Sequence, residues 1–215
     1  MSTGYAVKEV FYTLQGEGAR AGRPAVFLRF SGCNLWSGRE EARATAICRF
    51  CDTDFVGTDG PGGGRFETPE ALADHVDSTW TSVAGENGPR YVVCTGGEPL
   101  LQLDAALIAA LHDRQFEIAV ESNGTIKAPT GIDWLTISPK MGADLEQQQG
   151  DELKLVFPQE RCDPGAFEAL DFSTFYLQPM DGPLAAENTL AAVEYVQRHP
   201  RWSLSLQTHK YVGIP

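Results

Sequence analysis

Three cysteines spaced C-x14-C-x2-C constrain what this chain can fold into more than any other feature of its sequence. Only two residues separate Cys48 from Cys51, so one tight turn presents both thiols to a single metal centre, and Cys33 joins them across a loop. No fourth cysteine is nearby, whereas structural metal sites are normally closed by four protein ligands. The spacing therefore predicts a centre with one coordination position left open for chemistry.

The thiols by themselves leave three interpretations open. Zinc with a distant fourth ligand fits the spacing. A four-iron, four-sulfur cluster with one iron free of protein ligands also fits, since thiolates are the usual ligands of such clusters. The third interpretation needs no metal, because buried cysteines often serve as small hydrophobic residues. A lone C-x2-C pair is a weak signal, so the choice depends on the rest of the chain.

Composition and charge exclude several classes of protein. The chain of 215 residues fits a single domain, residues 1–215. Its 29 acidic residues outnumber 17 lysines and arginines, and a net charge of −12 repels phosphate backbones, which excludes direct nucleic-acid binding. The start has no apolar export segment, and the longest apolar helical stretch, residues 105–111, is too short to cross a membrane. Five cysteines do not suggest a disulfide framework, so we expect a cytoplasmic protein.

The hydrophobic pattern predicts an α/β fold. Strands are expected at residues 7–12, 25–30, 91–94, 117–121, 134–137, 153–157, 175–178 and 203–207. Helices are expected at residues 68–79, 104–114, 164–170 and 188–198, with a capping-box pattern at 37–40 and a glycine-rich loop at 57–64. This alternation predicts a parallel sheet with helical crossovers. Helices are fewer than strands, and residues 123–133 are too short or broken for a crossover helix, so we expect an incomplete, splayed (β/α) barrel.

Compact polar clusters follow the predicted strands, at the point where each strand ends. They are Ser31-Gly32-Cys33, Thr95-Gly96-Gly97-Glu98, Glu121-Ser122-Asn123-Gly124, Ser138-Pro139-Lys140, Gln178-Pro179-Met180-Asp181 and Gln207-Thr208-His209-Lys210. In parallel strand–helix architectures the carboxyl ends of the strands share one rim, and that rim carries the active site. The sequence therefore predicts that these clusters and the three cysteines meet on one face.

A few side chains suggest particular ligands. Gln15 and Glu17 lie in a turn with two glycines, where an amide and a carboxylate suit a polar heterocycle, although a solvated turn is the alternative. Arg29 suits a substrate carboxylate or an ordinary salt bridge. The oxygens of residues 52–54 suit magnesium or simple turn chemistry. His209 either takes part in the site or is an ordinary surface or core histidine.

The cysteines and the stretch Thr95-Gly96-Gly97-Glu98-Pro99 together resemble the radical S-adenosylmethionine enzymes. That resemblance implies a 4Fe-4S cluster whose open iron binds S-adenosyl-L-methionine. Most of the superfamily has the spacing C-x3-C-x2-C. The wider C-x14-C-x2-C of this chain departs from it and limits the resemblance to fewer families within the superfamily.

The match is closest to the 7-carboxy-7-deazaguanine synthases. Beyond the cysteines it rests on Thr13-Leu14-Gln15-Gly16-Glu17-Gly18, Arg29, Asp52-Thr53, Ser138-Pro139-Lys140, Gln178-Pro179-Met180-Asp181 and Gln207-Thr208-His209-Lys210. The resemblance implies a carbon–nitrogen lyase that converts 6-carboxy-5,6,7,8-tetrahydropterin to 7-carboxy-7-deazaguanine with loss of ammonia, by hydrogen abstraction and ring contraction, in queuosine or deazapurine biosynthesis. It also implies Mg2+, a homodimer, and an external electron donor such as a flavodoxin or ferredoxin.

The resemblance carries roles over to individual residues. It implies that Cys33, Cys48 and Cys51 hold the cluster and that Thr53 contacts Mg2+. It assigns the substrate to Leu14, Gln15, Gly16, Arg29, Thr95 and Pro215, and the chemistry of its polar cluster adds His209. It assigns S-adenosylmethionine to Phe50, Cys51, Asp52, Gly97, Ser138, Pro139, Lys140, Gln178, Pro179, Met180 and Asp181, and the chemistry of their clusters adds Glu98 and Glu121. In catalysis Arg29 fixes the carboxylate, Glu17 binds the pyrimidine edge, and Thr53 helps to hold the metal.

Two other functions stay open at this point. One is a different radical enzyme, such as an activase that makes a glycyl radical on a partner protein. The other is a zinc-binding module without catalysis, which would purify colourless under anaerobic conditions and contain zinc rather than iron and sulfide.

Overall fold

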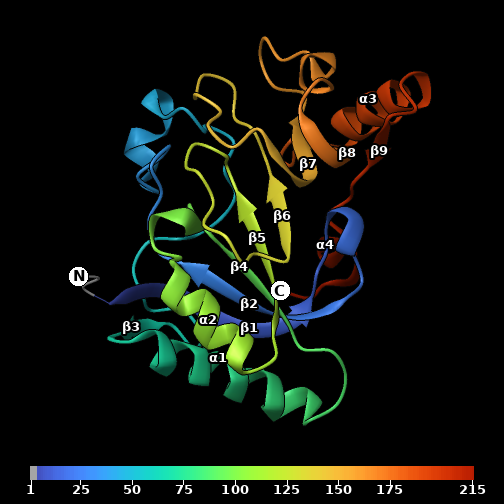
Figure 1. The fold of residues 1–215 in the computed structure, drawn as a ribbon. Coiled ribbons are helices and arrows are strands. Elements are labelled where there is room, and N and C mark those ends of the chain that lie inside the picture. Colours follow the sequence, from blue (N-terminus) through green and yellow to red (C-terminus); the bar gives the residue numbers. More distant parts are fainter. Residues whose placement is uncertain (1–3) are drawn as a thin grey trace.

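The computed structural model describes residues 4–215, which form one nine-stranded sheet (Figure 1). The strands are β1 (Tyr5–Leu14), β2 (Pro24–Phe30), β3 (Gly64–Phe66), β4 (Tyr91–Gly96), β5 (Glu117–Ser122), β6 (Trp134–Ile137), β7 (Gln149–Phe157), β8 (Asp171–Pro179) and β9 (Trp202–Leu204). Their order is β3-β1-β2-β4-β5-β6-β7-β8-β9, and every pair from β2 onward is parallel. Only β1 is antiparallel to its neighbours β2 and β3. The two edge strands do not pair with each other, which confirms an open α/β barrel.

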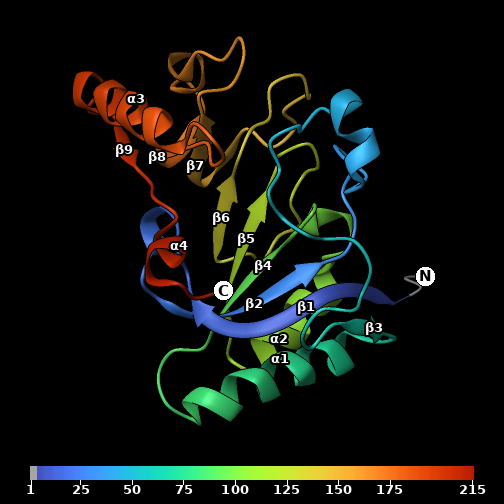
Figure 2. The same cartoon turned by 180° about the vertical axis from the view of Figure 1, so that it is seen from behind.

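Helices are fewer than strands in this part of the chain, as predicted. The α-helices are α1 (Pro69–Ala84), α2 (Ala105–Asp113), α3 (Ala185–Arg198) and α4 (Thr208–Val212). Short 3-10 turns occur at η1 (Gly18–Arg20), η2 (Glu40–Thr45), η3 (Pro99–Leu101) and η4 (Pro164–Phe167). No helix separates β5 from β6 or β6 from β7 within residues 117–157. The sheet is therefore covered by helices only in part. Helix α1 packs against β1 and β2, helix α2 packs against α1 and β5, and Figure 2 shows the two helices side by side.

Local sequence explains where α1 begins and ends. The Thr68 side chain accepts a hydrogen bond from the amide of Ala71 at 3.1 Å, and proline occupies the first turn, where its missing N–H costs nothing. Gly85 stops the helix with a φ of 63°, a backbone conformation that residues with a Cβ rarely adopt. The helix extends to Ala84, five residues beyond the predicted end, and it buries Leu72, Val76 and Trp80 against the sheet.

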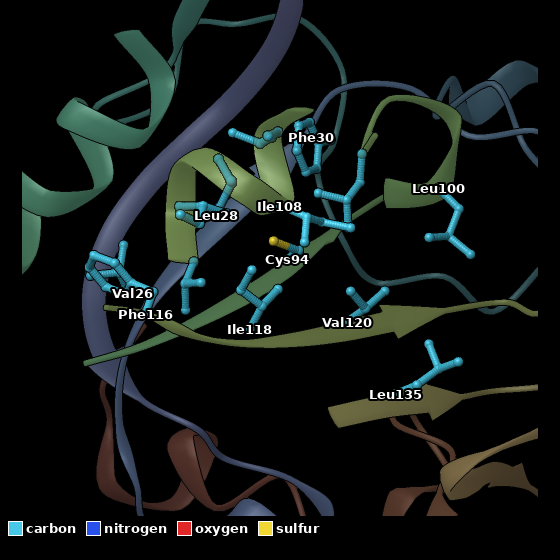
Figure 3. Close-up of a cluster of buried hydrophobic side chains, with 14 of the residues drawn as sticks. Val26, Leu28, Phe30, Cys94, Leu100, Ile108, Phe116, Ile118, Val120 and Leu135 are labelled. Carbon is cyan, nitrogen blue, oxygen red and sulfur yellow. The ribbon is translucent and has the colours of Figure 1, made fainter. Parts of the chain in front are cut away.

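The alternation of side chains along each strand separates the core from the opposite face. The cluster in Figure 3 packs between the sheet and the helices, and its labelled side chains include Val26, Leu28, Phe30, Cys94, Ile108, Ile118 and Val120. Successive residues of a strand point to opposite faces, so the residues between these core positions face away from α1 and α2. Cys94 is fully buried in this core and does not line the cavity that Cys33, Cys48 and Cys51 line.

Several predicted elements differ from the structure in kind or extent. Residues 164–170 form only a 3-10 turn over Pro164–Phe167, because a glycine follows the proline and weakens helical propensity in so short a segment. The predicted strand 203–207 ends at Leu204, and the chain then turns into α4, which the sequence reasoning missed. The short strand β3 begins at Gly64, at the end of the predicted glycine loop. Ser37 does not cap a helix, since η2 begins after Arg39 without a side-chain cap.

No helix among residues 4–215 is both long enough and apolar enough to cross a membrane, as the sequence predicted.

The positions of two helical leucines predict very different effects of their substitution on stability. Leu107 in α2 is fully buried, whereas Leu190 in α3 is 71% exposed. We expect Leu107→Ala to lower the free energy of unfolding by about 2–5 kcal/mol, because it removes buried methyl groups and leaves a cavity. The control Leu190→Ala should stay within about 0.5 kcal/mol of the parent. Urea denaturation measures both, and equal effects would contradict this assignment of the core.

Candidate functional site

A cavity of about 430 Å³ opens at the carboxyl ends of the parallel strands. All six polar clusters predicted from the sequence contribute to it, together with the turn after β1, the cysteine loop and α4. Of the predicted site residues, only Glu98 and Pro139 do not line it. The structure therefore brings together segments that are as far apart in the sequence as Leu14 and Pro215.

The three motif cysteines line this cavity as free thiols. A hydrogen bond from Cys48 lowers the pKa of Cys51 to about 6, and the same bond together with burial raises the pKa of Cys48. Burial also raises the pKa of Cys33. Cysteines bind metals as thiolates, and the bond between Cys48 and Cys51 shows that these two thiols lie within reach of each other.

One arginine organises the long loop between the first two motif cysteines. Nη1 of Arg43 donates hydrogen bonds to the carbonyl oxygens of Arg49 at 2.8 Å and Cys51 at 3.0 Å. Its Nε donates to Glu40, and its guanidinium lies 4.1 Å from the centre of the Trp36 ring. A planar group with five donors satisfies several acceptors at once, so Arg43 ties the loop to the C-x2-C turn.

Gly97 allows the β4 loop to lie directly against the cysteine loop. A Cβ at this position would lie 2.2 Å from the carbonyl oxygen of Gly32 and 2.6 Å from Cβ of Cys33. No side chain fits there, because both neighbours are too close. The close contact keeps Cys33 and the Gly-Gly-Glu-Pro stretch in one wall of the cavity.

Glu98 is one of the two predicted site residues that do not line the cavity, and its contact with the cofactor stays a prediction. It is fully buried and accepts hydrogen bonds from the amides of Leu100 and Asn123 and from the hydroxyl of Ser122. Burial raises its pKa, and these three donors oppose the rise. Glu98 thus joins the end of β4 to the end of β5 and does not reach the cavity. Pro139 also lies outside the lining, and its carbonyl accepts from Gln159.

The last residues of the chain contact the turn after β1 at the wall of the cavity. The hydroxyl of Thr13 donates to the backbone oxygen of Pro215 at 2.9 Å, and the amide of Thr208 donates to Gly16 at 2.9 Å. His209 packs against Gly16 so closely that a Cβ there would lie 2.1 Å from Nδ1 of the histidine. Burial lowers the pKa of His209, and Glu17 opposes this.

Lys210 joins two loops at the edge of the cavity. Its Nζ donates to Oδ2 of Asp52 at 2.7 Å and to Oδ2 of Asp181 at 2.5 Å. The ammonium lowers the pKa of Asp181. These half-exposed ion pairs are individually weak, but they connect the C-x2-C turn with the segment after β8 through α4.

Arg29 shows the salt bridge that was one of its two sequence interpretations. Its Nε donates to Oε1 of Glu9 at 2.7 Å, and the arginine also lines the cavity. The pair with Glu9 uses Nε, whereas an end-on clamp on a ligand carboxylate uses the two terminal nitrogens. The two interpretations are therefore compatible.

The sequence reasoning missed Lys154, although a lysine between two leucines in an apolar strand was a visible signal. Its Nζ donates to Oε2 of Glu17 at 2.6 Å and to Oε2 of Glu121 at 2.7 Å. Gln15 donates to the other oxygen of Glu121 at 3.2 Å, and Gln207 donates to the other oxygen of Glu17 at 3.0 Å. Gln15, Glu17 and Glu121 were predicted to bind ligands. In the structure they form one hydrogen-bonded network with Lys154 in the wall of the cavity.

This network separates the acidities of the two carboxylates. Burial alone would raise the pKa of Glu17, but the Lys154 ammonium and the bond from Gln207 lower it to about 2. Burial raises the pKa of Glu121 to about 7 in spite of the same ammonium. Glu17 therefore keeps its charge more firmly than Glu121, which is the more easily protonated of the two.

No three histidine, cysteine, aspartate or glutamate side chains among residues 4–215 come close enough together to hold one metal ion. Thr53 lines the cavity beside Asp52, where the sequence predicted contact with magnesium, and that role stays a prediction.

Comparisons with known proteins match nearly the whole length of this chain to the 7-carboxy-7-deazaguanine synthases. No protein-family model matches the chain. It is 64% identical over 211 residues to the 7-carboxy-7-deazaguanine synthase of Caulobacter vibrioides, covering 98% of this chain and 99% of the relative. It is 62% identical over 210 residues to that of Bradyrhizobium diazoefficiens, with the same coverage. The crystal structure of QueE from Escherichia coli aligns with a TM-score of 0.70 at 25% identity, over 97% of this chain and 96% of that chain.

The contacts of Arg43 predict that it controls the order of the cysteine loop. We expect Arg43→Met to speed amide hydrogen exchange in residues 40–53 by about tenfold or more, because hydrogen bonds from a charged donor to two carbonyls are lost. Mass spectrometry of exchanged peptides measures the effect. Arg198→Met is the control, since Arg198 is 70% exposed and pairs only with Glu194 on α3. Unchanged exchange in the loop would show that Arg43 does not organise it.

Proposed function

The chain belongs to the 7-carboxy-7-deazaguanine synthase family, and we propose that it acts as a radical S-adenosylmethionine enzyme of queuosine biosynthesis. The proposed reaction converts 6-carboxy-5,6,7,8-tetrahydropterin to 7-carboxy-7-deazaguanine with loss of ammonia. The observation that carries the proposal is that three cysteine thiols share one cavity with nearly all of the residues assigned to substrate and cofactor.

The donor set suits a 4Fe-4S cluster. Cys33, Cys48 and Cys51 would hold it, since all three line the cavity and thiolates are the usual ligands of such clusters. With S-adenosylmethionine, a bound cluster supplies the radical that removes hydrogen from the pterin. The protein contributes binding, orientation and exclusion of water around these reactants.

We assign S-adenosylmethionine to the part of the cavity nearest the cysteines. Phe50, Cys51, Asp52, Gly97, Ser138, Lys140 and the segment from Gln178 to Asp181 line the cavity and suit this role. Lys140 donates to the hydroxyl and the carbonyl of Ser138 at 2.6 Å, so this pair is already ordered. The bonds of Glu121 with Gln15 and Lys154 favour a place at the substrate rather than beside the ribose.

We assign the pterin to the part of the cavity formed by the turn after β1 and by α4. Arg29 would bind its carboxylate, and Glu17 its pyrimidine edge. Leu14, Gln15, Gly16, Thr95, His209 and Pro215 would complete the substrate contacts. Mg2+ would act as a Lewis acid on the substrate, with Thr53 as one of its protein contacts.

The proposal includes features outside the cavity. We propose that residues 1–215 act as one domain, that two copies form a homodimer, and that a flavodoxin or ferredoxin supplies electrons. The odd and modest number of cysteines supports a cytoplasmic location.

A single reconstitution tests the proposed function. We expect protein purified without oxygen to take up iron and sulfide. With S-adenosylmethionine, Mg2+ and a reductant it should convert the carboxypterin to a product with the mass of 7-carboxy-7-deazaguanine. Turnover of the pterin with no protein substrate excludes a glycyl-radical activase. Colourless protein that contains zinc and takes up no iron would instead support a zinc-binding module, and a loaded protein that leaves the pterin unchanged would contradict the proposed reaction.

Arg29 should affect substrate binding without affecting the cluster. We expect Arg29→Ala to weaken binding of 6-carboxypterin, a stable analogue, by about tenfold or more, because a charge-assisted contact to the carboxylate is lost. Iron content per chain should not change. Glu9→Gln is the matched control, since it breaks the Glu9–Arg29 pair and keeps the guanidinium. Equal affinities in the Arg29 variant and the parent would refute the role of Arg29.

A further inference from the structure

Lys154 is a buried cation that the resemblance and the comparisons do not assign. Its side chain is only 5% exposed, it lies in the middle of β7, and it lines the cavity. A buried ammonium is costly unless it is paired, and Lys154 is paired with two carboxylates, Glu17 and Glu121. The pairing joins β7 to β5 and to the turn after β1.

Strand alternation explains why a lysine occupies this position. Leu153 and Leu155 belong to the hydrophobic core, so Lys154 between them points to the opposite face of the sheet. Val156, two residues further along, also lines the cavity. An apolar residue at position 154 would fit the pattern of a strand, but it would leave Glu17 and Glu121 without the cation that pairs with them.

We propose that Lys154 is a positioning residue for substrate recognition, which fixes the carboxylate of Glu17 as the acceptor for the adjacent N–H donors of a 2-aminopyrimidinone ring. Glu121 holds the ammonium from the other side. This inference rests on the proposed function, because the pterin is the substrate that contains such a ring. The inference adds Lys154 as the residue that positions Glu17 for this ring.

The hydrogen bonds leave Glu17 able to bind a ligand. A carboxylate has two oxygens with about four acceptor positions between them. One position of Glu17 is occupied by Lys154 and another, on the other oxygen, by Gln207. Each oxygen therefore keeps an acceptor position, and two parallel N–H donors are the partner that matches a fixed carboxylate.

Charge explains why the ammonium is needed. The groups around Lys154 are Glu17 from the turn after β1, Glu121 from β5, Glu152 from β7, His209 from α4 and Lys140 from the loop after β6. Without Lys154, the buried Glu152 and the partly buried Glu17 and Glu121 would have only His209 and Lys140 as nearby bases. Burial would then raise the pKa of Glu17 with its main opposing charge removed. A protonated Glu17 has an O–H donor at the position where the N–H groups of the pyrimidinone ring need an acceptor. The affinity for the pterin would therefore fall as the pH falls.

The test compares affinity across pH in four proteins, with 6-carboxypterin as the probe and iron content as a second readout. We expect Lys154→Met to weaken binding relative to the parent by about tenfold or more near pH 6, and by less near pH 8.5, because Glu17 regains its charge at the higher pH. Lys154→Arg keeps the cation and should recover much of the affinity. Lys127→Met replaces an exposed lysine outside the cavity and should match the parent at each pH.

Each outcome distinguishes this inference from the proposed function. If the parent binds the pterin and Lys154→Met binds it equally well, or more weakly by the same factor at every pH, the positioning role is wrong. If the parent assembles its cluster but does not bind the pterin, the proposed function fails first. Should Lys154→Met not fold, the double variant Lys154→Met/Glu121→Gln, which also removes one buried carboxylate, is compared with Glu121→Gln in the same way. An unchanged pH profile in that pair would overturn the inference.

Discussion

The alternation of side chains in the parallel strands is the constraint on which the rest of this structure depends. Along β2, Val26, Leu28 and Phe30 enter the core, so Arg29 faces the cavity. Along β7, Leu153 and Leu155 enter the core, and Lys154 faces the cavity. A shift of one residue in either strand would exchange the two sets. Burial of the apolar set, which is the main stabilising term, therefore also positions the charged set.

The cavity is held together by contacts between segments that are distant in the sequence. Glu98 joins β4 to β5, Lys154 joins β7 to β5 and to Glu17, and Lys210 joins α4 to Asp52 and Asp181. The first two are buried, so they act in surroundings where an unpaired charge would be costly. The sheet is open, so its two edge strands do not hold each other in place as they would in a closed barrel. These contacts instead fix the strand ends relative to one another around the cavity.

Sequence reasoning worked where one short segment contains the whole signal. The N-cap of α1, the motif cysteines and the polar clusters were all visible as local patterns, and the structure brings the clusters to one cavity. It failed where a contact with a distant residue decides the outcome. The motif around Glu98 did not reveal its buried partners, Ser122 and Asn123, which belong to another strand end. Lys154 was overlooked because its neighbours read as ordinary apolar strand.

The sequence by itself determined which chemical groups are available and on which face of a strand each one lies, since residue identity and a period of two are local properties. It also determined the family, through motifs that extend over nearly the whole chain. Only the tertiary structure decided which of these groups touch: Glu17 with Lys154, Thr13 with Pro215, and Gly97 with the cysteine loop. Such pairings depend on how the sheet curves and on where its loops return, and no local pattern encodes either of these.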